Sequence, residues 1–159
     1  MGSRSKIDLA YIAGFLDGDG SLMLQIKKRK DCVRGIRFMA TICFYQNKRH
    51  RFPLRSIRRT FGIGYLSSRN DGMSELRING FGQVKNILND LLPYLRFKKK
   101  QALALAKACE ILDKTTFKNL SQKQLKKLIG LILVIQNENY VTKKKKTKEE
   151  LFKILGLTP

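Results

Sequence analysis

The stretch that decides the fold is Ile12-Ala13-Gly14-Phe15-Leu16-Asp17-Gly18-Asp19-Gly20, which closes a short predicted helix. We expect this helix to begin at an N-cap at Asp8 and to run to about Asp17. Gly18 and Gly20 should stop it, because glycine readily adopts the left-handed conformation that ends helices. The helix is therefore short and ends in an acidic, glycine-rich segment.

Small side chains recur along one side of the helix at Ala10, Ala13, Gly14 and Asp17. Large side chains pack into a domain's own core, whereas a small stripe lets a second helix approach closely. Only one copy of the segment is present, so the simplest partner is the same helix of a second chain, related by a twofold axis. The alternative is an ordinary buried helix with an incidental glycine.

Two aspartates stand at the end of this helix, where the macrodipole is already negative and carboxylates are disfavoured. If two such ends met at a twofold axis, Asp17 and Asp19 would repel their counterparts further. Divalent cations bridging the carboxylates to phosphate oxygens would remove this conflict and would activate water for phosphodiester hydrolysis. The pattern therefore favours a metal-dependent site that acts on a nucleic acid.

The charge of the chain points to the same class of partner. The 159 residues include 33 Lys and Arg against 12 Asp and Glu, a net charge of +21, while 43% apolar residues suffice for a core. Between Gln25 and Arg59 there are 12 basic residues and a single acid, Asp31. A solvated face would mix signs, so a surface that follows a phosphate backbone is the better interpretation. Basic clusters at 96–100 and 143–146 are less specific.

Several classes of protein are disfavoured. The 3 cysteines are widely spaced and there is 1 histidine, so neither a zinc site nor a disulfide framework is predicted. No phosphate-binding glycine loop for a nucleotide cofactor is present. Any metal should have oxygen ligands, which favours Mg²⁺.

The longest apolar stretch, Leu128 to Ile135, is too short to cross a bilayer, and no leader is evident. We therefore expect a protein that is neither membrane-bound nor secreted.

Hydrophobic periodicity and turn residues predict the remaining elements. Alternation predicts two hairpins, and helical spacing with capping residues predicts the helices. The hairpins are 21–29 with 37–43 around a turn at 31–35, and 65–69 with 74–78 around Asn70-Asp71-Gly72. One predicted helix starts at Pro53 and ends near Gly62, and two more span 83–92 and 98–112. Capping boxes at Ser121 and Thr147 begin two further helices. The order α-β-β-α-β-β-α with C-terminal helices from about residue 121 is of the α+β class, in one domain spanning 1–159.

Segments 12–20, 25–27, 61–65 and 95–102, together with Gln46, are similar to the LAGLIDADG homing endonucleases. The match covers most of the chain and is in register with the single-motif, homodimeric branch of the family. The resemblance implies the αββαββα fold with a curved antiparallel sheet. It also implies Mg²⁺ as cofactor, with Mn²⁺ or Ca²⁺ as other cations that could bind.

The resemblance also implies a role for individual residues. Asp19 takes the position of the metal-binding carboxylate, with the carbonyl of Gly18 assisting, whereas Asp17 looks structural. Gln46 would position the nucleophilic water and Lys98 would lie near the scissile phosphate. The family places an arginine in the same pocket, where this chain has His50 with Arg51 beside it, and either could supply the basic contact.

The polar faces of the two hairpins form the predicted DNA-reading surface, because their side chains can pair with base edges. A nine-residue strand spans roughly 30 Å, or about nine base pairs, so a dimer would read a pseudo-palindrome of roughly twenty. Phosphate contacts are expected from 96–100 and from Lys143 and Lys144. The reading residues are Met23, Gln25, Lys27, Arg29, Arg37, Met39, Thr41, Cys43, Ser67, Arg69, Glu75 and Arg77.

The predicted function is a homodimeric, Mg²⁺-dependent endonuclease that cuts both strands of a long double-stranded DNA target and promotes intron mobility. The resemblance suggests an organelle (chloroplast or mitochondrion) or a microbial cytoplasm as its location. Three alternatives stay open: an RNA-binding intron maturase, a catalytically silent DNA-binding protein of the same fold, and an unrelated basic protein such as a ribosomal component. The last leaves the segment 17–20 unexplained.

Overall fold

The computed structural model describes residues 4–32 and 35–158 and follows the predicted order of elements. Two short 3-10 turns, η1 (Lys48–His50) and η2 (Phe117–Asn119), are added to it. The strands are β1 (Gly20–Lys28), β2 (Ile36–Asn47), β3 (Tyr65–Ser68) and β4 (Met73–Asn79). The helices are α1 (Lys6–Asp19), α2 (Phe52–Phe61), α3 (Phe81–Leu91), α4 (Lys99–Lys114), α5 (Gln122–Glu138) and α6 (Lys148–Ile154). None of these helices is long and apolar enough to span a bilayer.

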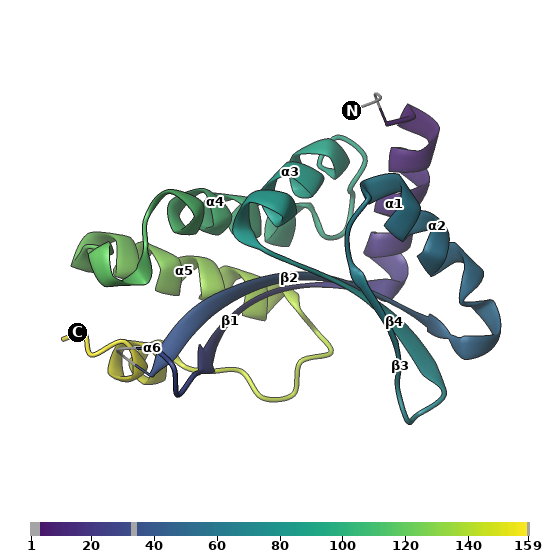
Figure 1. The fold of residues 1–159 in the computed structure, drawn as a ribbon. Helices are drawn as coiled ribbons and strands as arrows, with labels where there is room; N and C mark the ends of the chain where they lie inside the picture. Colours follow the sequence, from purple (N-terminus) through teal and green to yellow (C-terminus); the bar gives the residue numbers. More distant parts are fainter. Residues whose placement is uncertain (1–3, 33–34, 159) are drawn as a thin grey trace.

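The four strands form one antiparallel sheet in the order β1-β2-β4-β3. β2 is the longest strand and holds the sheet together, because its residues 36–44 pair with the whole of β1 and its residues 41–47 pair with β4. The sheet is curved: helices α1, α3, α4 and α5 cover its convex side, and its concave side opens between α6 and the β3–β4 hairpin (Figure 1). This confirms the predicted α+β architecture with a curved sheet.

One face of the sheet forms the core with the helices. The alternation of the two hairpins predicts this face, and the structure confirms it, since the alternate apolar residues of three strands are buried against the helices. These residues are Leu22, Leu24, Phe38, Ala40, Ile42, Phe44, Leu76 and Ile78.

Several predicted turns and caps are also confirmed, whereas the predicted turn 31–35 lies partly outside the described residues. Pro53 lies in the first turn of α2, which ends at Gly62 in the left-handed region (φ +69°). Gly72 turns the β3–β4 hairpin with φ +80°. Both capping boxes are formed, at Ser121 on α5 and at Thr147 on α6.

The predicted limits of α1 are wrong. The helix begins at Lys6 with Ser5 as N-cap instead of Asp8, and it continues through Gly18 to Asp19. Gly20 does not stop it by a left-handed turn, because its backbone is extended (φ −114°, ψ 169°). Glycine is needed for close approach: a Cβ there would lie 2.5 Å from Leu16 Cδ1 and 2.9 Å from Leu16 Cα. The chain therefore passes from α1 into β1 without a loop.

Candidate active site and nucleic-acid interface

Asp19 is the last residue of α1, next to the first residue of β1, and its side chain is exposed. Within the ranges that the structure describes, its carboxylate has neither a hydrogen bond nor an ion pair. The last carbonyls of a helix have no partner within the helix. Here the carbonyl of Leu16 accepts from the Gly20 N–H and that of Asp17 accepts from Lys98, whereas the Gly18 carbonyl has no such partner in the described part of the chain. An exposed carboxylate beside such a carbonyl is a donor set that suits Mg²⁺.

Asp17, only two residues away, has a different environment. Its Oδ2 accepts from the backbone N–H of Arg96 at 2.8 Å and of Phe97 at 3.3 Å, and its Oδ1 accepts from the N–H of Lys98 at 2.9 Å. These amides precede α4, whose N-terminus favours a negative charge. The conflict expected for Asp17 at the end of α1 is therefore resolved inside the chain, and the argument for a cation applies to Asp19 alone.

Lys98 interacts electrostatically with both acids. Its side chain is 9% exposed, and its Nζ donates to the backbone carbonyl of Asp17 at 2.6 Å. Burial lowers the pKa of the Lys98 ammonium below its ordinary value, while the charges of Asp17 and Asp19 oppose that shift. The structure thus brings a buried lysine to the same junction as the candidate metal carboxylate.

A groove of about 1360 Å³ opens at this junction. It is lined by the end of α1, the start of β1, residues 93, 94 and 96–98, and residues 138–142, and it includes Gly18, Asp19 and Lys98. Within the described chain, no three His, Cys, Asp or Glu side chains converge into a metal cage. A metal held by Asp19 and the Gly18 carbonyl would therefore need further oxygen ligands other than such side chains of the described chain.

The other predicted catalytic residues lie at the end of β2, outside the lining of this groove. The Oε1 of Gln46 accepts from the N–H of Asn47 at 2.8 Å. His50 is exposed in η1. Arg51 is half-buried, and its Nη1 donates to Ser68 Oγ of β3 at 3.4 Å. The roles predicted for these three residues stay predictions.

The small stripe on α1 differs from the predicted set. Ala13 is fully buried in its own core, and the carboxylate of Asp17 faces residues 96–98, whereas Ala10 and Gly14 are exposed. Two large side chains share the exposed side: Ile7 is 81% exposed and Tyr11 is 57% exposed. The helical spacing 7, 10/11, 14 and 18 could have identified this side. It is an apolar surface with two glycines at its centre and end.

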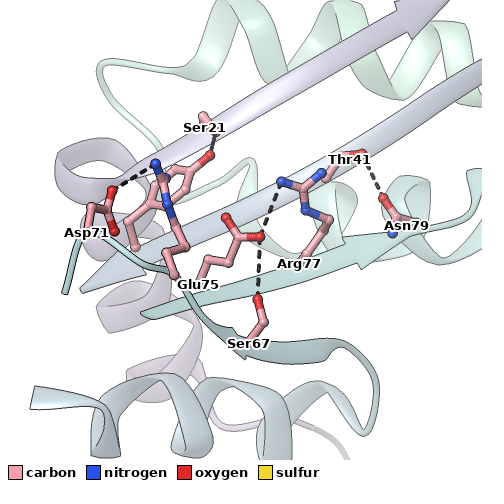
Figure 2. A network of polar contacts seen from close by, with 9 residues as sticks. Ser21, Thr41, Ser67, Asp71, Glu75, Arg77 and Asn79 are labelled. Carbon is pink, nitrogen blue, oxygen red and sulfur yellow. Dashed lines mark hydrogen bonds and ion pairs between the residues drawn. The ribbon is translucent and has the colours of Figure 1, made fainter. Parts of the chain in front are cut away.

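Strand register brings the side chains of the predicted DNA-reading surface, here called the reading face, next to one another. The β1–β2 hairpin pairs Gln25 with Met39 and Lys27 with Arg37. On the other hairpin Glu75 lies between Ser67, whose Oγ donates at 3.5 Å, and Arg77, whose Nη2 is at 3.3 Å (Figure 2). The predicted polar side chains of both hairpins thus stand on one face of the sheet.

Two predicted reading residues are buried. Thr41 is fully buried and donates to Asn79 Oδ1 at 2.7 Å (Figure 2). Cys43 is also fully buried, between the cross-strand neighbours Ser21 and Arg77. Period-two alternation assigns a residue to a face but does not say whether neighbouring side chains cover it. The prediction that these two residues contact bases is therefore wrong for the described conformation.

The flanks of this face carry the remaining predicted contacts. Arg29 pairs with Asp31 at 2.7 Å and Arg69 pairs with Asp71 at 2.9 Å. Lys143 and Lys144 are exposed between α5 and α6. The sequence analysis missed Tyr45. Its hydroxyl forms a hydrogen bond with Ser21 Oγ at 3.2 Å, and the residue lines the same groove as Asp19.

Comparison with known proteins agrees with this geometry. The family model of the LAGLIDADG endonucleases matches residues 12–112. The chain belongs to the LAGLIDADG endonuclease family. The matched region includes Asp19, Gln46, Lys98 and both hairpins of the sheet.

Individual relatives give the extent of the likeness. DNA endonuclease I-CvuI of Chlorella vulgaris is 34% identical over 99 residues, which are 62% of each chain. DNA endonuclease I-CreI of Chlamydomonas reinhardtii is 33% identical over 106 residues, 67% of this chain and 64% of that protein. These alignments thus span less than two thirds of either relative. A crystal structure of the homing endonuclease I-CvuI superimposes over 97% of this chain and 98% of that one, with a TM-score of 0.74 and 28% identity.

Proposed function

We propose that this chain is a site-specific homing endonuclease that acts as a homodimer and cuts both strands of a long, pseudo-palindromic double-stranded DNA target. The observation that carries the proposal is Asp19, an exposed carboxylate without a protein partner in the described chain, fixed where the first helix meets the reading sheet. Supporting it, I-CvuI has been crystallised in complex with DNA targets in the presence of Mg or Ca.

Asp19 and the Gly18 carbonyl would hold the divalent cation, which we propose to be Mg²⁺. When bound, the metal supplies charge stabilisation to the phosphate and activates water. Lys98 would orient the scissile phosphate, since its buried ammonium lies beside the same junction. Gln46 would hold the water. Of the two candidates for the basic contact we favour His50, because the guanidinium of Arg51 is turned towards Ser68.

The dimer would form through the exposed side of α1. Two such helices could approach closely at Gly14, where an added Cβ meets no atom of the same chain within 4 Å. Ile7 and Tyr11 would be covered by the partner helix, removing apolar surface from water. A twofold axis there would bring two copies of Asp19 together, so that each chain serves one strand.

The open face of the sheet would read the target. Gln25, Lys27 and Arg37 would pair with base edges, and Glu75 would accept from cytosine. Lys143 and Lys144 would contact phosphates on the flank. Intron mobility in an organelle or microbial cytoplasm would follow from a long, rare target.

The decisive experiment selects cleaved sites from a randomised DNA library with Mg²⁺ and repeats the selection with Asp19→Asn. We expect one long, nearly palindromic site to be cut by the wild type. The variant should bind that site and leave it intact, because it loses a metal ligand and keeps the reading face. Cleavage by the variant at the wild-type rate would refute the metal assignment. RNA binding without DNA cleavage by the wild type would favour the maturase alternative, which the named relatives, both DNA endonucleases, do not favour.

A further inference from the structure

Helix α2 carries basic side chains that the proposed endonuclease does not use. Arg55, Arg58 and Arg59 are exposed and, with Arg51 just before the helix, follow the spacing 0, 4, 7 and 8 that defines one side of a helix. The opposite side is buried through Leu54, Ile57 and Phe61. The helix contains no acid, and none of the four arginines forms an ion pair with the described residues. Like charges at this spacing destabilise an isolated helix, so the arrangement is costly without an anion.

These arginines surround a hollow. A concavity of about 410 Å³ is lined by the four guanidinium side chains and by Leu66 of β3. The Nε of Arg51 is buried there and has no hydrogen-bond acceptor within the described parts of the chain. A buried donor without an acceptor costs more than the bond itself would contribute. A phosphate oxygen entering the hollow would satisfy it and neutralise the surrounding charge.

The hollow faces away from the reading surface. Ser67 hydrogen-bonds Glu75 on the open face of the sheet, and successive side chains of a strand point to opposite faces. Leu66 therefore points to the side of the sheet that the helices cover, so a duplex lying on the open face would not fill the hollow. Phe52, the first residue of α2, is 69% exposed on the same side of the helix as Arg55 and Arg59. An exposed aromatic ring beside arginines is a stacking platform for an unpaired base.

We propose that the hollow and Phe52 form a second nucleic-acid site, which binds an unpaired segment of RNA. The guanidinium groups would hold successive phosphates and Phe52 would stack one base. Duplex DNA offers no unstacked base, whereas folded RNA exposes such bases in loops and bulges. The site uses none of the residues that we assign to the endonuclease centre, although Arg51 directly follows His50 in the chain, and it does not depend on cleavage activity.

The test measures binding of a fluorescently labelled 20-nucleotide oligouridine RNA by anisotropy, with excess mixed-sequence duplex DNA present to occupy the reading face. The variants are Arg55→Gln/Arg58→Gln and, separately, Phe52→Ala. The matched control is Lys123→Gln/Lys126→Gln, which removes the same charge at the same spacing from exposed positions of α5 that form no ion pair with the described residues. Thermal melting of every variant checks that the fold is intact.

We expect the arginine variant to weaken RNA binding at least tenfold and Phe52→Ala to weaken it about fivefold or more, while the control changes it about twofold or less. Duplex affinity, measured without RNA, should change about equally in the arginine variant and the control. An equal loss of RNA binding in the control would overturn the proposal, as would a specific loss of duplex binding in the arginine variant. Equally tight, Arg55-dependent binding of a DNA strand, oligodeoxythymidine, would overturn the assignment to RNA.

Discussion

Asp17 and Asp19 offer a matched pair of substitutions, because the same change two residues apart should affect different properties. Asp17→Asn replaces a carboxylate that accepts three backbone N–H groups at the start of α4. Asp19→Asn replaces a carboxylate without a partner in the described chain. We expect the first to lower the free energy of unfolding and the second to leave it almost unchanged.

The magnitude for Asp17 can be worked from its contacts. A hydrogen bond to a charged group contributes about 1.5–3 kcal/mol, and the asparagine amide keeps one acceptor oxygen while its NH₂ group faces donors. Since Asp17 is only half-buried, we take about 2–3 kcal/mol for the whole substitution. For a chain of this size that corresponds to a fall in Tm of roughly 4–12 °C. Asp19→Asn should stay within about 0.5 kcal/mol.

The assay is urea unfolding followed by circular dichroism, at equal protein concentration and without metal. Asp113→Asn serves as a further control, because Asp113 makes a half-exposed ion pair with Lys85 at 3.5 Å, worth at most about 1 kcal/mol. If Asp17→Asn unfolds at the same urea concentration as Asp19→Asn, the anchoring of α4 by Asp17 has no energetic weight and the reasoning fails.

Three further outcomes are expected. Gly14→Leu should leave the monomer folded but abolish the dimer in analytical ultracentrifugation, whereas a dimer of unchanged affinity would exclude this side of α1 as the interface. In native protein at pH 8, Ellman's reagent should label one thiol of three, Cys32, because burial raises the pKa of Cys109 to about 12 and also raises that of Cys43; more than one labelled thiol would contradict this. Burial lowers the pKa of Lys98 below the value of about 10.4 in the unfolded chain, so the unfolded state binds more protons between these values. The stability of the wild type relative to Lys98→Met should therefore rise with pH in that window, and a constant difference in urea unfolding would count against the burial of its charge.

Much of the fold was predictable because its signals are local. Alternation fixed the buried face of the hairpins, and Pro53, Gly62 and Gly72 marked turns whose backbone only such residues adopt readily. The limits of α1 were not predictable in this way. Glycine is required at position 20 because Leu16 lies close to it, and turn propensities contain no information about such packing distances.

In the candidate site, too, features with a local signal could be predicted and features that depend on distant residues could not. Asp19 could be identified from the electrostatics of a helix end together with the family likeness. The anchoring of Asp17 could not, since its partners are about 80 residues away in the sequence. The burial of Thr41 and its hydrogen bond to Asn79 of another strand could not be predicted either, since alternation along one strand does not show them.

The direct passage from α1 into β1 has a consequence for how new target specificities could arise. No loop separates Asp19 from the strand, so in the proposed endonuclease the offset between the cut phosphate and the first base read would be set by backbone geometry. Inserting one residue after Asp19 would turn every side chain of β1 to the opposite face, exchanging core for reading surface. If the proposed function holds, substitutions along the strand could therefore change which bases are preferred, but the distance from the break to the recognised bases would be a fixed dimension of the fold.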